Sequence, residues 1–222
     1  MRTSGFGLRG RVIPAQAPEL PERAIPAERL FPARRRALWA LAALLVAAAA
    51  SQFAAAGWIH AKAILAQWLI AGSWSQARAT GEAIRPWPWA DTRPIARLTV
   101  PSRGIVRYVL EGASGRSLAF GPGHLSGTAS PGGWGNAVIV AHKDTHFAFL
   151  KDLEPDEEIV VETARGGLAR YRVSEVAVVG REDSRVLDPA DSPQLTLITC
   201  YPFEAVRPGA VLRYVVVAGR VA

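Results

Sequence analysis

Residues 195–202 read Leu-Thr-Leu-Ile-Thr-Cys-Tyr-Pro, an apolar run that ends at Cys200 and Pro202. A short, branched apolar run of this kind predicts a buried β-strand. Pro202 has no backbone N–H to give to a sheet ladder, so we expect the strand to end there. Side chains at a strand end emerge from the core. The pattern therefore predicts that the Cys200 thiol opens toward a groove.

Cys200 is the only cysteine among the 222 residues. No disulfide within the chain can therefore use it. A free cysteine is either a buried inert thiol or a reactive one, and its surroundings must decide between the two.

A second apolar run, Asn-Ala-Val-Ile-Val-Ala at 136–141, is followed directly by His142 and a polar stretch. The continuous apolar character predicts another buried strand. His142 thus stands at the end of its strand, as Cys200 does. The two side chains can meet if the two strands are neighbours.

Arg213 lies within a third apolar run, at 212–216. An arginine in such a run is costly unless it faces a groove or a partner. Strand alternation puts it on the face opposite Leu212 and Tyr214. A guanidinium held there could donate to an oxygen that becomes negative during acyl transfer.

Short apolar runs separated by Gly, Pro and Asp fill the chain from residue 97 onward. Together with a helical turn near 147–150, they predict an all-β domain over 97–222, folded as a closed barrel of about eight strands. Further strands are predicted at 105–110, 158–162, 168–179 and 211–218, with a hairpin between the second and third of these.

The uncharged run 37–59 predicts a membrane anchor. As a helix it would span about 35 Å, enough to cross a bilayer. Arg34, Arg35 and Arg36 precede it, which predicts a cytoplasmic N-terminus and a domain on the outer side. A signal peptide cleaved near Ala54-Ala55-Ala56 is the alternative. The long leader and the length of the run favour an uncleaved anchor.

The net charge of +7 is concentrated before this anchor. Residues 1–36 hold eight Arg and three Glu, which leaves only +2 for the rest of the chain. This distribution argues against a nucleic-acid surface on the folded part. The segment 1–36 instead resembles a disordered, Pro-rich cytoplasmic tail that contacts anionic headgroups.

Two segments are expected to join the anchor to the barrel. Residues 60–80 have helical periodicity, with Ile64, Leu65, Trp68 and Leu69 on one face, and predict a membrane-proximal amphipathic helix. Residues 81–96 contain Pro-Trp-Pro-Trp and predict an extended tether. Its two Trp side chains suit either the bilayer interface or a groove on the domain.

The segment 196–200, Thr-Leu-Ile-Thr-Cys, resembles the TLxTC signature of the sortase family. The run 136–142 is similar to the histidine strand of sortases, and Arg213 falls where the active-site arginine of the family is expected. The resemblance covers roughly 95–220. Within the family, the stretches 142–150 and 200–203 look most like the proteobacterial-type (class GN-like) sortases, which would place the domain in a periplasm.

This resemblance implies a cysteine transpeptidase with no cofactor. Cys200 would attack a Thr–Gly-type bond in an LPxTG-like C-terminal sorting motif, and an amine would then release the protein from the thioacyl-enzyme. His142 would transfer the protons, and Arg213 would stabilise the oxyanion. Asp144 is a candidate to orient His142, but an exposed turn aspartate is the simpler interpretation.

Four further residues are candidates for contact with substrate: His124, Thr199, Tyr201 and Arg207. Arg207 is also the rival of Arg213 for the oxyanion role, although its place before a Pro-Gly turn favours a solvated side chain. A metal site at His142 and His146 would require a shared helix and further ligands. The preceding strand argues against it.

Other functions remain open at this point. The same fold could be a cysteine peptidase that uses water as acceptor, a pilin polymerase that uses a lysine, or an inactive anchored binding module. An unrelated peptidoglycan transpeptidase would typically have His-Gly-Cys at the nucleophile, whereas Thr199 precedes Cys200 here.

Overall fold

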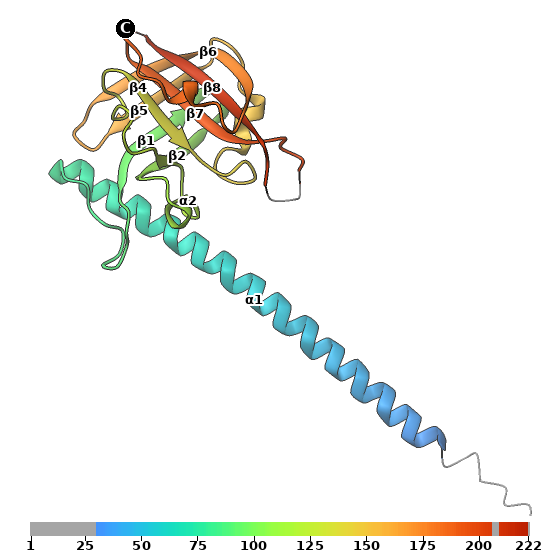
Figure 1. Cartoon of the computed structure of the whole chain (residues 1–222). Helices are drawn as coiled ribbons and strands as arrows, with labels where there is room; N and C mark the ends of the chain where they lie inside the picture. Colours follow the sequence, from blue (N-terminus) through green and yellow to red (C-terminus); the bar gives the residue numbers. More distant parts are fainter. Residues whose placement is uncertain (1–29, 206–208, 222) are drawn as a thin grey trace, which may run out of the picture. The chain divides into compact units, whose positions relative to one another are not determined.

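The computed structural model describes residues 30–205 and 209–221 (Figure 1). Most of the predicted tail 1–36, together with the candidate Arg207, lies outside the described residues. The chain divides after residue 55 into two compact units.

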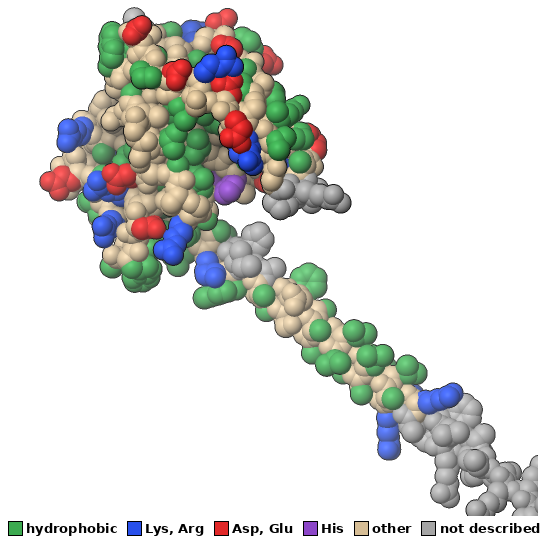
Figure 2. Space-filling model, in the orientation of Figure 1, with side chains coloured by type: hydrophobic (Ala, Val, Ile, Leu, Met, Phe, Trp, Pro, Cys, Tyr) green, Lys and Arg blue, Asp and Glu red, His purple; other side chains and the backbone are tan. Residues whose placement is uncertain are grey.

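One long helix, α1, runs over Leu30–Thr80 and has 51 residues. Its segment Arg34–Ala55 has 22 residues and, among the described helices, is the one long and apolar enough to cross a membrane. Apolar side chains cover this segment (Figure 2). The predicted anchor 37–59 and the predicted helix 60–80 therefore lie within one continuous helix.

Eight strands form a closed barrel in the order β1-β2-β3-β4-β7-β8-β6-β5, which confirms the predicted fold class. Short helical turns interrupt the strands: η2 (Pro101–Arg103), α2 (Gly115–Leu118), η3 (Ala148–Asp152) and η4 (Ser184–Leu187). The strands are β1 (Pro94–Val100), β2 (Ile105–Glu111), β3 (Gly123–His124), β4 (Asn136–Val140), β5 (Glu158–Thr163), β6 (Leu168–Gly180), β7 (Gln194–Tyr201) and β8 (Leu212–Val221).

Two strands differ from the sequence prediction. β1 begins at Pro94, three residues before the predicted start of the barrel, where a proline is tolerated because it is the first residue of the strand. β3 has only two residues, Gly123 and His124, too few to produce an alternating pattern. A Cβ on Gly123 would lie 2.4 Å from the Gly112 carbonyl oxygen, so this close approach of two backbones requires glycine.

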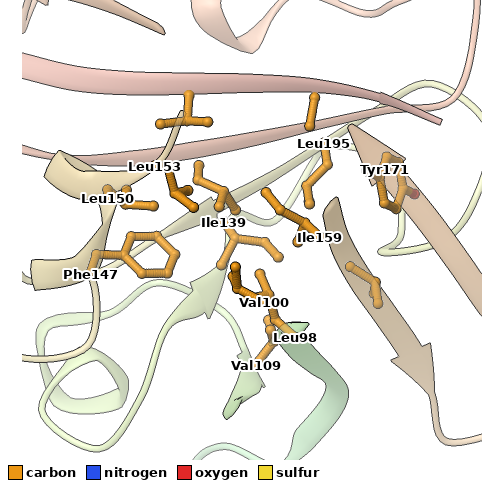
Figure 3. Packing of buried hydrophobic residues seen from close by; sticks show 14 of the residues in the cluster. Leu98, Val100, Val109, Ile139, Phe147, Leu150, Leu153, Ile159, Tyr171 and Leu195 are labelled. Carbon is orange, nitrogen blue, oxygen red and sulfur yellow. The ribbon is translucent and has the colours of Figure 1, made fainter. Parts of the chain in front are cut away.

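The barrel encloses one large apolar core (Figure 3). Side chains from β1, β4, β5, β6 and β7 meet there, with Phe147 and Leu150 closing one side from the 142–153 connection. These buried positions alternate along their strands, as in the pattern of β1, where every second residue is buried. The labelled core residues are Leu98, Val100, Val109, Ile139, Phe147, Leu150, Leu153, Ile159, Tyr171 and Leu195.

The last four turns of α1 pack on the barrel through a face that differs from the predicted one. Ile70, Trp74 and Ala77 are buried, whereas Ile64 and Trp68 are exposed. Trp74 packs on Tyr108 of β2 at a ring-centroid distance of 6.2 Å. The predicted face was defined by large apolar side chains. Small side chains such as Ala77 allow the close approach of a helix to a sheet, and they carry little hydropathy signal.

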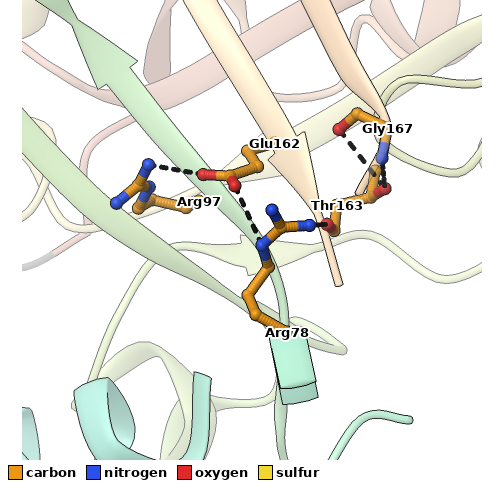
Figure 4. A network of polar contacts seen from close by, with 5 residues as sticks. All are labelled: Arg78, Arg97, Glu162, Thr163 and Gly167. Atoms are coloured by element: carbon orange, nitrogen blue, oxygen red, sulfur yellow. Dashed lines mark hydrogen bonds and ion pairs between the residues drawn. The ribbon is translucent and has the colours of Figure 1, made fainter. Parts of the chain in front are cut away.

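Ionic contacts fasten the same end of α1 (Figure 4). Glu162 of β5, whose side chain is 14% exposed, lies between Arg78 Nε at 2.9 Å and Arg97 Nη2 at 2.5 Å. Arg78 also donates from Nη1 to the Thr163 carbonyl at 3.3 Å. One carboxylate thus joins the helix to β1 and β5.

The tether after α1 uses its two tryptophans differently. The Trp87 ring packs edge-on against Phe120 at 5.2 Å, whereas the Trp89 side chain is 83% exposed. Trp87 therefore contacts the domain, whereas the bilayer interface stays a prediction for the exposed Trp89.

Candidate active site

Strands β4, β7 and β8 lie side by side and bring the three predicted catalytic residues to one end of the sheet. β4 and β7 pair in parallel, with Val140 opposite Ile198. The pairing continues past the end of β4, because the Ala141 N–H donates to the Ile198 carbonyl at 3.2 Å. His142 is the next residue, so it comes level with Cys200.

Cys200 and Arg213 are direct cross-strand partners in the antiparallel pair β7–β8. Such partners project to the same face, with Cβ atoms about 4.5–5.5 Å apart. The two residues are separated by 13 positions in the sequence but are immediate neighbours in the sheet. This pairing puts the Arg213 side chain on the same face of the sheet as the Cys200 thiol.

That face is the outer face of the barrel wall. Val138, Ile198 and Val215 form a buried cluster of their own, separate from the main core. Cys200 and Arg213 are each two residues from a member of this cluster on their strands, so alternation places them on the same face. Cys200 is partly exposed and His142 is exposed. The sulfur is therefore not sealed inside the barrel.

The Arg213 guanidinium is held by backbone carbonyls at and just before the start of β8. Its Nη1 donates to the carbonyls of Ala210 at 2.8 Å and Leu212 at 2.9 Å. These bonds restrict the side chain without neutralising it, because both acceptors are uncharged. A positioned cation beside a thiol is suited to stabilise negative charge on a substrate oxygen.

Thr199 has a buried, structural position, which gives no support to the expectation that it contacts substrate. Its side chain is 2% exposed, and its Oγ1 donates to the Ala141 carbonyl at 2.7 Å. It points toward the barrel interior because it alternates with Cys200. This bond ties the residue before Cys200 to the residue before His142.

Replacing Thr199 with Val is expected to lower the free energy of unfolding by about 1–2 kcal/mol, because the buried Ala141 carbonyl loses its donor while the side-chain shape is kept. Denaturant unfolding of the full chain in detergent measures this. Thr199→Ser keeps the hydroxyl and serves as the comparison. A Val variant as stable as wild type would show that the bond contributes nothing.

Tyr201 belongs to an aromatic cluster beside the site. Its ring stacks on Tyr214 at 6.1 Å and meets Phe203 edge-on at 6.3 Å. Phe203 and Tyr214 also pack on the main core. Tyr201 therefore closes the end of the barrel on the side opposite the thiol.

His124 does not join the three residues. Its Nε2 bonds to the Ala129 carbonyl at 2.8 Å and lies 3.2 Å from Thr128 Oγ1. It lines a separate polar cavity of about 760 Å³ together with Arg93 and Glu111. Its expected role with substrate receives no geometric support.

His146 follows His142 by four residues and is partly buried. Burial lowers its pKa, and the positive charge of Arg107 lowers the pKa further. Arg107 donates from Nε to the His146 carbonyl at 3.2 Å and lies over the Phe149 ring. Within the described ranges no three His, Cys, Asp or Glu side chains cluster in a way that would hold a metal.

A groove lies on the outer face along β6, β7 and β8, and its lining does not include Cys200, His142 or Arg213. It has a volume of about 480 Å³ and includes Val186 from the β6–β7 connection and Thr196 of β7 in its lining. Thr196 precedes Cys200 by four residues, about 13 Å along a strand. The groove therefore lies on the same face of β7 as the Cys200 side chain.

Asn136 anchors the wall of this groove. Its Nδ2 donates to the carbonyls of Val186 at 3.2 Å and Asp188 at 3.1 Å, and its Oδ1 accepts from Thr196 Oγ1 at 2.7 Å. The only sequence signal for this network was a polar residue at the start of a wholly apolar run.

Comparison with known proteins identifies the family. The Sortase domain model matches residues 98–221. The chain belongs to the sortase family. Among curated proteins, it is 27% identical to Sortase D of Bacillus subtilis (strain 168) over 125 residues, which is 56% of this chain and 62% of the relative. The match thus spans less than two thirds of that sortase.

Solved sortase structures have the same barrel. Sortase A from Corynebacterium diphtheriae superposes with a TM-score of 0.54 at 31% identity, covering 60% of this chain and 63% of that one. A Clostridium perfringens Sortase D5 transpeptidase gives 0.54 at 25% identity, with 67% and 88% covered. These matches do not support the narrower resemblance to proteobacterial-type sortases, which stays a prediction.

Proposed function

We propose that this sortase is a membrane-anchored cysteine transpeptidase with Cys200 as nucleophile, His142 as proton carrier and Arg213 as oxyanion stabiliser. The observation that carries the proposal is the pairing at one sheet end. Cys200 and Arg213 are direct partners, and His142 follows the adjoining strand at the same level. Two residues of paired strands and a third residue just after the neighbouring strand thus lie at one end of the sheet, which supports the proposal.

The first step forms a thioester. The Cys200 sulfur attacks the threonine carbonyl carbon of an LPxTG-like sorting motif, and the negative charge on the carbonyl oxygen is met by the Arg213 guanidinium. The C–S bond forms, the C–N bond to glycine breaks, and His142 gives its proton to the leaving amine. The groove beside Val186 would hold the residues before the reacting bond.

The second step releases the product. The nitrogen of an acceptor amine attacks the thioester carbon and transfers a proton to His142. The new C–N bond forms as the C–S bond breaks, and the Cys200 thiolate is regenerated. With water as acceptor the same geometry would produce hydrolysis, so the acceptor decides between transfer and peptidase activity.

The anchor sets where the reaction occurs. The apolar segment of α1 is compatible with a single membrane span, and the three arginines at 34–36 favour a cytoplasmic N-terminus. The catalytic domain would then work on the outer face of the plasma membrane. In a proteobacterial-type cell that compartment would be the periplasm.

Intact-mass spectrometry of the full chain in detergent tests this function. Incubation with an LPxTG-like peptide is expected to add the mass of the acyl fragment to Cys200, and an added amine is expected to release it as a transfer product. The full chain is needed because Trp74 and Ile70 of α1 are buried in the domain. The absence of any adduct with a panel of such peptides would contradict the proposal.

Arg213→Ala is expected to lower kcat on the order of 10²-fold, as expected for the loss of an oxyanion donor. Arg213→Lys keeps the charge but not the planar fork, so it should restore activity only in part. Peptide cleavage kinetics measure both, with Arg220→Ala at the exposed end of β8 as control. An unchanged rate in Arg213→Ala would move the role to Arg207 or to backbone donors.

A further inference from the structure

Lys143, the residue after His142, has an unusual environment for a lysine. Its side chain is only 10% exposed. Its Nζ contacts three oxygens: Asp144 Oδ1 at 2.7 Å, the Phe203 carbonyl at 2.7 Å and the Ala205 carbonyl at 2.8 Å. An ammonium group has three N–H donors, so this lysine uses all of them. Lysines are rarely so buried unless they are paired.

These bonds connect the two segments that carry the candidate catalytic pair. Lys143 adjoins His142, whereas Phe203 and Ala205 follow Cys200 by three and five residues. One ammonium group therefore holds the backbone after the cysteine against the backbone after the histidine. The contacts link positions that are 60 and 62 residues apart in the chain.

A second tie lies on the other side of the pair. Thr199 Oγ1 donates to the Ala141 carbonyl and so joins the residues that precede Cys200 and His142. The strand register thus fixes the positions of Cys200 and His142 along their strands, independently of Lys143. Lys143 instead holds together the two segments that follow His142 and Cys200, and a bound peptide would lie against these segments.

The neighbouring Asp144 balances the lysine charge. Its carboxylate is 69% exposed and pairs with Lys143 Nζ. The sequence makes Asp144 a candidate partner for the His142 imidazole, but its carboxylate contacts Lys143 instead. The Lys-Asp dipeptide after the histidine therefore functions as an ion pair at the junction of two connections.

We propose that Lys143 is a positioning residue that holds the 203–205 segment against the His142 connection and thereby sets how a bound peptide lies over the thiol and the imidazole, whose own positions the strand register fixes. This inference rests on the proposed transpeptidase function. It assigns Lys143 no proton transfer, because its three donors are already engaged.

Lys143→Met in the full chain, in detergent, tests the proposal. The side-chain length is nearly kept while the donors are lost. We expect kcat for peptide cleavage to fall about tenfold or more, since small misplacements of reacting groups are costly, with a smaller change in KM. Lys143→Arg keeps a cationic donor and should recover most of the rate. Lys151→Met, at an exposed lysine of η3, is the matched control.

Two readouts distinguish positioning from a general loss of structure. Iodoacetamide reacts with Cys200 as the only cysteine, and its alkylation rate in Lys143→Met should stay close to wild type because the strand register is retained. Amide hydrogen exchange at 203–205 should accelerate, while exchange in β7 and β8 stays slow.

The proposal is overturned if Lys143→Met keeps the wild-type kcat. It is also overturned if kcat, alkylation and strand protection are lost together and Lys143→Arg restores none of them, since the residue would then act only in folding. A wild-type enzyme that forms no peptide adduct would instead contradict the proposed function. An active wild type with an equally active Lys143→Met would contradict this inference alone.

Discussion

Cys200→Ala is expected to abolish adduct formation with a sorting-motif peptide and to reduce turnover by at least about 10³-fold, because loss of the nucleophile in covalent catalysis removes nearly all of the rate enhancement. Intact-mass spectrometry follows the adduct, and chromatography of the peptide products follows turnover. The methyl group of alanine fits the partly exposed position, so the fold should be unaffected.

The control for this variant is its stability and its ability to bind peptide. A thermal midpoint close to that of wild type, with the peptide still bound, would assign the loss to chemistry. Full biological activity of Cys200→Ala would instead support the alternative of an anchored binding module. An intact barrel and groove in this variant would be consistent with such a binding module.

His142→Ala is expected to lower kcat by about 10²–10⁴-fold, the range that general acid–base catalysis supplies. Both chemical steps need the imidazole, the first to protonate the leaving amine and the second to accept a proton from the acceptor. Steady-state kinetics with a fluorogenic peptide measure the loss. A partial recovery with added imidazole would support proton transfer as the missing function.

His124→Ala is the matched histidine comparison. The His124 ring bonds to the Ala129 carbonyl, outside the cluster of three, so its replacement should have a much smaller effect on kcat. If His124→Ala and His142→Ala reduced kcat equally, the assignment of the proton carrier would be wrong. Equal thermal stability of the two variants is the condition for this comparison.

The second half of α1 is attached to the barrel by specific side-chain contacts. Arg78 and Trp74 fasten that half to the barrel, so the helix is part of the domain rather than a loose spacer. Acidic and basic side chains are interspersed on the visible face of the barrel (Figure 2).

Trp89 of the tether is exposed, whereas its neighbour Trp87 packs against Phe120.

Local patterns in the sequence were sufficient to predict the strands around Cys200, His142 and Arg213, the closed barrel and the apolar segment before it. These features depend on the period of hydrophobic residues and on signals such as Pro202, which act within a few residues. The 105–110, 158–162 and 168–179 runs were predicted for the same reason, and each corresponds to a strand.

The pairing of strands has no such local signal. That β7 lies between β4 and β8, and so places Cys200 opposite Arg213, follows from the closure of the whole barrel. The burial of Thr199, the helix face at Ile70 and the ties made by Lys143 also appear only in three dimensions. A side chain that donates to a backbone carbonyl 60 residues away leaves no mark on the sequence, because every residue type supplies the same carbonyl.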